Sequence, residues 1–479
     1  MDTKKRTIQL IIGPVLFAIA SVALKGAIGG PGAMAIGTLL WMVFWWVTQP
    51  VALTVTAFLP VGVNAIFGMV EMGDVISQYA SGSIILVFGS CLLTIPWATT
   101  GLDRRVALKV LSLVGPSMKS QITVWLLASM IFSSCLPNVA VCALFTPIAV
   151  AMIHAAGYED IKKAAPAVPI LLCIGWGAGL GGVGSPLGGA MNVAAIQFFQ
   201  EWSGHEFMYV DWIVRILPFF ILTAILTLSL MYFFFTRKGE KLEGTKDYFE
   251  KAYAELGPMK NDEKICGILF LLAMAGAFCR PLFANALPAL EPAYIFAILG
   301  SMSFVLTRGG KDGKREPMMT WDHAQANVMW GMMLLFGGGL ALGKVVNGSG
   351  AGEAIAKLIT DMHLTNDLAI VVVFVLFAVL ISELTNSTVS AAVTVPIILT
   401  LCTNLGLNPV PYWFILVMGY NAEFLLPVSV RAITVGNGLD ADKQMKYGVP
   451  FVIARAILVI VLGYAFLKLW PMFGQLSYL

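Results

Sequence analysis

Charged side chains are scarce in this sequence. Asp, Glu, Lys and Arg make up 12% of its 479 residues, against roughly 25% in an ordinary soluble protein. With so little charge and 58% apolar residues, a water-soluble globular fold is excluded. The charges also favour neither sign, because there are 30 basic and 27 acidic residues. The chain therefore has no strongly basic face for a nucleic-acid backbone, and we expect no nucleic-acid partner.

Metal-binding and disulfide patterns are also missing. The four histidines stand alone in the sequence, and the seven cysteines lie mostly inside apolar runs without paired ligand spacing. We predict that the cysteines are small core residues. The sequence indicates neither a metal site nor a cofactor.

Long apolar runs, by contrast, recur along the whole chain. Many approach or exceed the roughly 20 residues that one helix needs to cross hydrocarbon. They predict an all-α polytopic membrane protein, since segments inside lipid must satisfy their own backbone hydrogen bonds. The runs are 7–26, 33–48, 51–70, 83–99, 121–150, 167–200, 216–236, 265–285, 292–307, 326–345, 367–399, 411–439 and 447–470.

Two of these runs, 121–150 and 367–399, are too long for one plain crossing. Proline or polar residues break each of them near its centre. Each fits a re-entrant hairpin, which leaves about eleven transmembrane helices and a cytoplasmic N-terminus. Lys and Arg concentrate in the segments assigned to the cytoplasmic side, as the positive-inside rule requires, with Arg280 and Lys357 as exceptions.

The chain also contains an internal duplication. FSSCLPNVAVCALFTP, which ends at Pro147, resembles ISELTNSTVSAAVTVP, which ends at Pro396, at an offset of 249 residues. Gly101 and Gly350 match at the same offset. With an odd number of crossings between equivalent points, the copies have opposite orientations, as in inverted-repeat secondary transporters. Chance similarity among apolar helices is the alternative.

The duplication predicts four regions. They are an N-terminal transmembrane helix at 1–30, a first inverted repeat at 31–236 with hairpin 121–150, a cytoplasmic linker at 237–264, and a second inverted repeat at 265–479 with hairpin 367–399. The linker is the only sizeable polar segment. Phe249, Tyr253 and Leu256 recur in it at helical spacing, which predicts one helix on the membrane surface.

The centres of the two hairpins are candidate ligand sites. Unpaired backbone groups at bilayer depth are tolerated only against protein or a water-filled cavity. Pro137 favours a helix start there, and each helix N-terminus carries roughly half a positive charge that attracts anions. The alternative is that these polar residues only cap helices. The candidates are Ser133, Pro137, Asn138 and Val139 at the first break, and Asn386, Ser387 and Thr388 at the second.

Two further segments contribute candidates. The glycine-rich stretch 179–192 holds Gly184 and Ser185 at a predicted helix interruption, although its glycines equally suit tight helix packing. Pro427 and Arg431 lie in an apolar setting. The arginine either faces the cavity as an added positive charge or snorkels to the interface. Glu383 is either a proton carrier or a structural acid.

These motifs resemble those of the divalent anion:sodium symporter family of carboxylate transporters, over nearly the whole chain. The resemblance includes the two hairpin tips, GLD at 101–103, LLFGGGLAL around Phe336, GSP at 184–186 and LPV at 426–428. It implies an elevator mechanism in a homodimer, with sodium sites at the tips and the facing helix breaks. A multi-pass protein of the cell membrane is expected.

The tips depart from the family's Ser-Asn-Thr. The first, Pro137-Asn138-Val139, keeps only the asparagine, and the second reads Asn386-Ser387-Thr388. The family's later Thr-Pro-Pro-Asn is replaced by residues 430–433, which include Arg431. Oxygen ligands for sodium are therefore lost. Two helix ends and Arg431 sum to about +2, which could balance a dicarboxylate without sodium.

We therefore predict an electroneutral exchanger of C4 and C5 dicarboxylates such as succinate, malate, fumarate and 2-oxoglutarate. One alternative is a sodium-coupled symporter of di- or tricarboxylates. An alternative of another class is a membrane-embedded enzyme, which would need paired acids or histidines near one membrane face.

Overall fold

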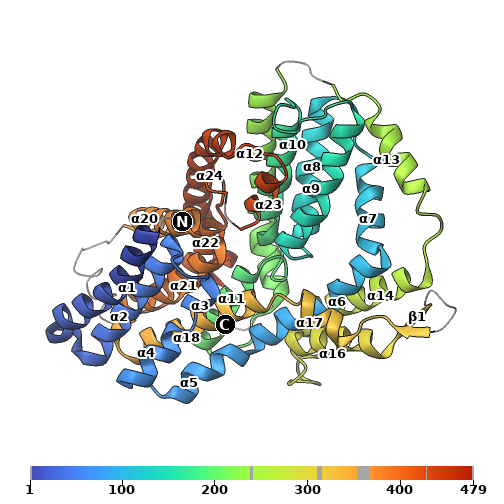
Figure 1. The fold of residues 1–479 in the computed structure, drawn as a ribbon. Helices are drawn as coiled ribbons and strands as arrows, with labels where there is room; N and C mark the ends of the chain where they lie inside the picture. Colours follow the sequence, from blue (N-terminus) through green and yellow to red (C-terminus); the bar gives the residue numbers. More distant parts are fainter. Residues whose placement is uncertain (1–2, 238–240, 310–314, 353–365, 428, 477–479) are drawn as a thin grey trace.

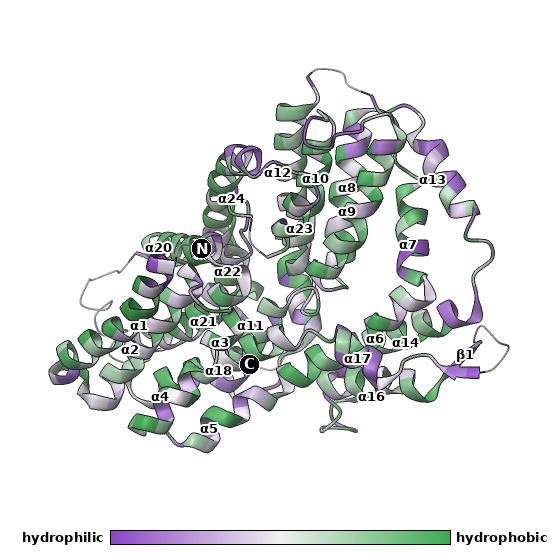
Figure 2. Cartoon of the chain, viewed as in Figure 1, coloured by the Kyte–Doolittle hydropathy of each residue, from purple (hydrophilic) through white to green (hydrophobic). Residues whose placement is uncertain are grey.

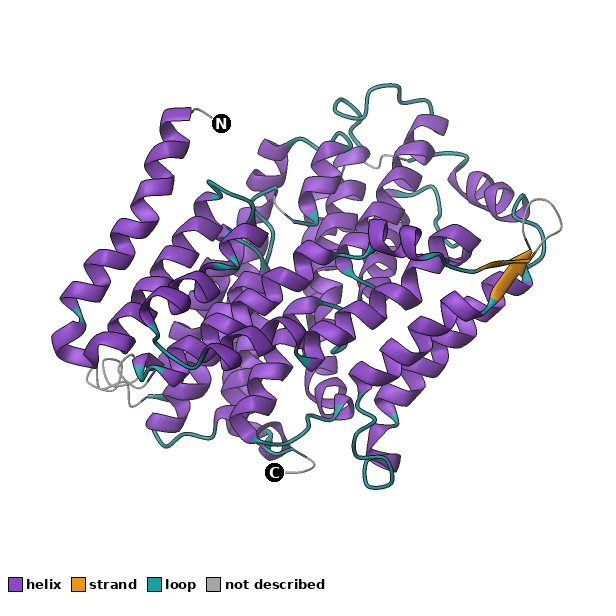
Figure 3. Cartoon of the chain, turned by 60° about the horizontal axis from the view of Figure 1, so that its bottom comes forward, coloured by secondary structure: helices purple, strands orange, loops and turns teal. Residues whose placement is uncertain are grey.

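The computed structural model of the protein describes residues 3–237, 241–309, 315–352, 366–427 and 429–476. Nearly all regular structure in these ranges is helical (Figure 1). The exception is one pair of short antiparallel strands, β1 (Thr307–Gly309) and β2 (Arg315–Pro317), which Figure 3 shows in orange. The predicted all-α membrane fold is confirmed.

The helices before the linker fall into an N-terminal group and a group that contains the first interrupted pair. The N-terminal group is α1 (Thr3–Ala23), α2 (Lys25–Thr48), α3 (Leu53–Thr56), α4 (Leu59–Phe67), α5 (Met72–Ser77) and the 3₁₀ turn η1 (Gln78–Ala80). The second group is α6 (Gly82–Thr100), α7 (Leu102–Leu111), α8 (Met118–Ser133), α9 (Asn138–Ala155), α10 (Ala167–Gly181), η2 (Gly182–Gly184), α11 (Ala190–Ser203) and α12 (Tyr209–Phe235).

The helices from the linker onward contain the second interrupted pair. They are α13 (Thr245–Ala254), α14 (Asn261–Phe278), α15 (Arg280–Phe283), α16 (Pro292–Val305), α17 (Trp321–Asn327), α18 (Trp330–Gly348), α20 (Asp367–Leu384), α21 (Ser387–Asn404), α22 (Pro409–Tyr420), α23 (Arg431–Gly436), α24 (Ala441–Leu469) and η3 (Pro471–Gly474).

Nine helical segments in the described ranges are long and apolar enough to cross a membrane, and two of them, α9 and α20, belong to the predicted hairpins. Other apolar helices are shorter, since α16 has 14 residues and α22 has 12, against the roughly 20 of a plain crossing. All 12 residues of α22 are buried. This helix is therefore enclosed by protein and does not have to span lipid alone.

Both predicted hairpins appear as interrupted helix pairs. In the first pair, α8 ends at Ser133 and α9 begins at Asn138, directly after Pro137. In the second pair, α20 ends at Leu384 and α21 begins at Ser387. The sequence signals of helix start therefore located both breaks correctly.

Helix boundaries repeat at the offset of the sequence duplication. Helices α9 and α21 both have 18 residues and begin 249 positions apart. The left-handed glycines Gly101 and Gly157 recur as Gly350 and Gly406, again with positive φ. Because only glycine adopts this backbone conformation at little cost, the shared turns make chance similarity a poor explanation of the duplication.

Many large apolar side chains are exposed on the outer surface, as expected of a protein in lipid. Apolar residues, green in Figure 2, cover most helices, whereas hydrophilic residues gather on elements such as α13 and β1. On α24, Ile453, Ile457 and Val461 are each more than half exposed and lie one turn apart. Such a stripe is stable against acyl chains but not against water.

The linker packs on the first half of the chain instead of lying free. Phe249 on α13 is fully buried, and its ring lies 6.1 Å from the ring of Trp125 on α8. Arg105 on α7 forms a 2.8 Å ion pair with Glu263, at the start of α14, and donates to the carbonyls of residues 256–258. The predicted helix is present, although it ends before Leu256, and it is a docked element.

One exception to the positive-inside pattern has a structural explanation. Arg280 is 1% exposed and donates two hydrogen bonds to the Glu206 carboxylate, at 2.7 and 2.8 Å. It also donates to the carbonyls of Leu287 and Pro288. Arg280 is thus a neutralised internal residue. Lys357, the other exception, lies outside the described residues.

Helices α8 and α10 pack closely through two glycines four residues apart. A Cβ atom on Gly181 would lie 2.3 Å from the Met130 carbonyl oxygen, and one on Gly177 would lie 2.9 Å from the Ser129 Cβ. At Gly179, on the same helix, a Cβ would meet nothing within 4 Å. Small residues at this spacing let membrane helices approach at backbone distance.

We predict that Gly181→Ala destabilises the protein by about 1–3 kcal/mol, because the new methyl group collides with backbone. The matched change Gly179→Ala should be neutral or stabilise by up to about 1 kcal/mol, since alanine favours helix. Thermal unfolding of the purified proteins, followed by tryptophan fluorescence, measures both effects. Equal melting temperatures for the two variants would contradict the packing described here.

Candidate functional site

The tips of the two interrupted pairs line one cavity of about 710 Å³. Pro137, Asn138 and Val139 contribute from the first tip, and Ser387 and Thr388 contribute from the second. Five of the eleven residues predicted from the sequence are thus brought together across about 250 residues of chain. Glu423 also lines the cavity, and it was not among the residues predicted from the sequence.

The first tip presents a helix start without a side-chain cap. Pro137 occupies the position before α9, and no side chain accepts a hydrogen bond from the first turn there. Ser133 is fully buried behind the tip, with its Oγ 2.7 Å from Asn138 Oδ1 and 2.6 Å from the Ala178 carbonyl. Ser133 therefore orients Asn138 and does not itself line the cavity.

Gly184 and Ser185 are not among the lining residues of this cavity. The Ser185 hydroxyl donates to the Ser134 carbonyl, and a Cβ on Gly184 would lie 2.1 Å from the Ser134 Oγ. These contacts join η2 to the end of α8. Such contacts are typical of tight helix packing, which was the alternative interpretation of the glycine-rich stretch 179–192.

At the second tip, α21 carries a side-chain cap. The Asn386 Oδ1 accepts a 2.9 Å hydrogen bond from the Val389 N–H, so Asn386 acts as an N-cap and lies outside the cavity lining. The N–H of Ser387, the first residue of α21, donates to the Glu423 carboxylate. The anion-attracting end of this helix is therefore occupied by a side chain of the protein itself.

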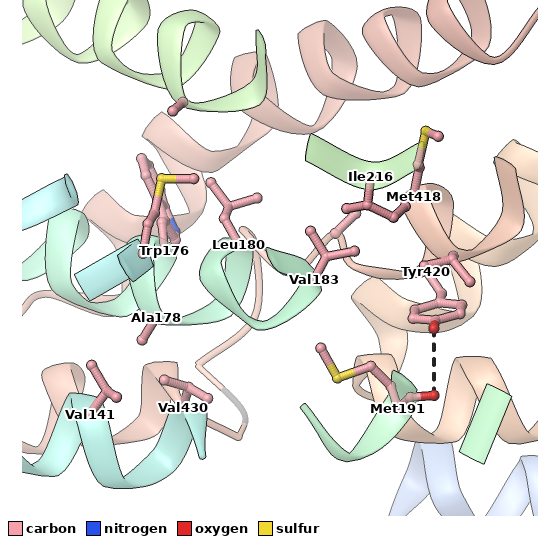
Figure 4. Packing of buried hydrophobic residues seen from close by; sticks show 14 of the residues in the cluster. Val141, Trp176, Ala178, Leu180, Val183, Met191, Ile216, Met418, Tyr420 and Val430 are labelled. Carbon is pink, nitrogen blue, oxygen red and sulfur yellow. Dashed lines mark hydrogen bonds between the residues drawn. The ribbon is translucent and has the colours of Figure 1, made fainter. Parts of the chain in front are cut away.

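The described residues between α22 and α23, 421–427 and 429–430, form an irregular segment beside the second tip. The indole N–H of Trp176 on α10 donates to the Phe424 carbonyl at 3.3 Å, and the Asn421 amide donates to the Leu180 carbonyl at 3.3 Å. Figure 4 shows Tyr420, just before the segment, with its hydroxyl directed at the Met191 carbonyl, 3.4 Å away. Helix α10 thus provides hydrogen bonds to the irregular segment, whose backbone lacks those of a regular helix.

Arg431 lies between two carboxylates at the end of this segment. Its Nη2 is 3.0 Å from Glu423 Oε2, and its Nη1 is 3.6 Å from Glu383 Oε2. Glu383 also accepts hydrogen bonds from the N–H groups of Phe424 and Leu425, at 2.8 and 2.9 Å. Arg431 is 1% exposed, so it does not snorkel, and Glu383 is a structural partner of the irregular segment.

This arrangement corrects the role predicted for Arg431. The predicted sum of about +2 needed an arginine whose charge was available to a substrate. The structure places two carboxylates on that arginine, and Arg431 does not line the cavity. Pro427 is half-buried within the irregular segment and is likewise absent from the lining. The signal that could have revealed Glu423 is an acidic residue inside an otherwise apolar run.

Two larger cavities flank the site at positions related by the repeat. One, of about 1390 Å³, shares Pro137 and Met329 with the central cavity. The other, of about 890 Å³, has no lining residue in common with it. At the 249-residue offset, four lining positions of the first correspond to four of the second. They are Ile95, Ala98, Thr99 and His323 in the first, and Lys344, Asn347, Gly348 and Asp74 in the second.

An aromatic side chain packs between the second flanking cavity and the helices of the site. Phe198 on α11 lines that cavity, and its ring lies 2.5 Å from where a Cβ on Gly343 would stand. In the first repeat the equivalent of Gly343 is Thr94, which lines the cavity that reaches the site. The two repeats therefore have the same architecture but different packing around the centre.

A helical membrane protein with two interrupted helix pairs meeting at one cavity has the architecture of a secondary transporter. The chain belongs to the citrate transporter family, whose model matches residues 43–419. The resemblance predicted from the motifs is thereby confirmed. The family and its relatives are transporters, which removes the membrane-embedded enzyme from consideration.

Two relatives and one solved structure illustrate the similarity. The sodium-dependent dicarboxylate transporter SdcS of Staphylococcus saprophyticus is 27% identical over 475 residues, covering 96% of this chain and 91% of that protein. SdcS of Staphylococcus aureus is 26% identical over 473 residues, with coverage of 95% and 90%. The YdaH transporter of Alcanivorax borkumensis shares the fold at a TM-score of 0.52 and 12% identity, covering 92% of this chain and 99% of that one.

We predict that Arg431→Met destabilises the protein by about 3–5 kcal/mol, because two buried carboxylates lose their shared partner. Lys446→Met removes a cation from an exposed position on α24 and should change stability by less than about 0.5 kcal/mol. Chemical or thermal unfolding in detergent distinguishes the two. An Arg431→Met protein as stable as the Lys446→Met protein would show that the ion pairs contribute little.

Proposed function

We propose that this protein carries C4 and C5 dicarboxylates across a membrane by secondary active transport coupled to sodium. Its relatives are named sodium-dependent dicarboxylate transporters, and both hairpin tips meet at one cavity. The substrate-binding residues of the proposal are the lining tip residues Pro137, Asn138, Val139, Ser387 and Thr388, with Ser133 orienting Asn138.

Charge balance supports a coupled cation. A dicarboxylate carries about two negative charges at neutral pH, and two helix ends supply about one positive charge. With both carboxyl groups ionised, Glu383, Glu423 and Arg431 together carry one net negative charge. Arg455, which is buried in α24 and donates to the Met418 carbonyl, adds one positive charge. The bound state then keeps about one uncompensated negative charge, which costs several kcal/mol at bilayer depth.

Sodium-independent exchange is the second candidate. It is favoured by the first tip, where proline and valine replace the hydroxyl residues that would offer oxygens to sodium. It is weakened by the two carboxylates on Arg431, since the charge that was to replace sodium is already neutralised within the protein.

The two flanking cavities are the access routes of the proposed mechanism. The cavity of about 1390 Å³ shares lining with the site, whereas the one of about 890 Å³ does not, as expected when one route is open and the other closed. We propose that the repeats 31–236 and 265–479 have opposite orientations, with a cytoplasmic N-terminus and linker. Movement of the hairpins in an elevator-like manner would then exchange the open and closed routes, within a homodimer.

Transport and its coupling are tested in proteoliposomes that contain the purified protein. We expect uptake of labelled succinate to rise at least severalfold with an inward sodium gradient, compared with an equal potassium gradient. Protein-free liposomes are the control. Uptake that does not depend on sodium but is accelerated by unlabelled dicarboxylate inside the liposomes would favour the exchanger. No protein-dependent uptake of any C4 or C5 dicarboxylate would refute the proposed function.

The access routes are tested by sided thiol labelling. Asn327→Cys and Asn347→Cys place exposed thiols at the first and second flanking cavities, in a Cys279→Ser background that removes an exposed native thiol. We expect a membrane-impermeant maleimide to label the two sites from opposite sides of the membrane. Labelling of both sites from one side would contradict the inverted arrangement.

A further inference from the structure

Among the described residues that line the central cavity, Glu423 is the one with a charged side chain. Its side chain is 10% exposed, and each carboxylate oxygen has its own partner. Oε1 accepts from the Ser387 N–H at the start of α21, and Oε2 lies 3.0 Å from Arg431 Nη2. A helix N-terminus and a guanidinium are two of the strongest carboxylate partners that a protein offers.

The other acid of the cluster is held differently. Glu383 is anchored by two backbone N–H groups of the irregular segment and stays near Arg431 at 3.6 Å. It does not line the cavity. If Glu423 moved away, Arg431 would therefore keep one carboxylate beside it. Glu383 alone is enough to neutralise Arg431. Glu423 can therefore be displaced without leaving the arginine unpaired.

A substrate in this cavity brings a carboxylate close to that of Glu423. Two such groups repel strongly where water is scarce, and the Ser387 N–H has a single proton to donate. Glu423 projects from backbone outside any helix, between α22 and α23. Its side chain therefore leaves the contact without breaking a helix.

Building on the proposed function, we propose that Glu423 is a resident anion that a substrate carboxylate must displace from the N-terminus of α21 and from Arg431. The substrate then takes over both partners, while Glu383 continues to neutralise the arginine. Glu423 thereby sets the affinity for anionic ligands and favours dianions, whose second carboxylate binds at the uncapped start of α9.

Equilibrium binding of radiolabelled succinate to the purified full-length protein tests this role. Glu423→Gln removes the competing charge at nearly constant shape, so we expect its Kd to fall on the order of tenfold. Glu383→Gln removes the same charge from the same arginine but from behind the cavity, and it should gain none of this affinity. Glu423→Asp keeps the charge but shortens its reach, so it should gain affinity less than Glu423→Gln does.

Thermal unfolding of each variant shows whether it is folded, and Glu423→Asp carries the test if Glu423→Gln does not fold. Unchanged or weaker binding by a folded Glu423→Gln protein would overturn the inference, because Glu423 would then shape the site without competing for it. An equal gain for Glu383→Gln would overturn it as well, since general charge removal would explain the effect. If neither wild type nor any variant binds a C4 or C5 dicarboxylate, the proposed function itself fails. Binding by Glu423→Gln alone supports the inference.

Discussion

The low dielectric constant of a membrane interior makes every unpaired charge and every free backbone group costly. Beside the cavity, the chain meets this constraint with Arg431, which is placed between Glu383 and Glu423. Glu383 also accepts hydrogen bonds from two backbone N–H groups of the irregular segment, those of Phe424 and Leu425. The same three side chains therefore stabilise the non-helical backbone beside the cavity and fix the local charge. The position of the second tip depends on them, because Glu423 holds the Ser387 N–H.

Local sequence signals located the two helix breaks. Pro137 and Asn386 are residue types that begin helices for stereochemical reasons, and both stand directly before a helix in the structure. The internal duplication could also be predicted from the sequence, because it rests on similar residues at one constant offset. These features are local or repeated, so they do not depend on the path of the chain between them.

The partners of Arg431 could not be predicted in the same way. Glu423 lies beyond the end of α22, eight residues before Arg431 at the start of α23, and the two side chains meet without a helical repeat between them. No periodic pattern encodes such a path. The docking of the linker on Trp125 and the full burial of the short helix α22 likewise depend on tertiary packing. Hydropathy alone therefore did not predict these contacts.

The linker is also joined to the first half of the chain by Arg105 and Glu263, where α7 meets the start of α14. Their side chains are only 8% and 5% exposed, in contrast to the pair of Lys163 and Asp160, at 87% and 49%. Dissolved ions weaken contacts between exposed charges far more than contacts between enclosed ones. The ion pair between α7 and α14 should therefore persist over a wide range of ionic strength, from dilute to concentrated salt solution.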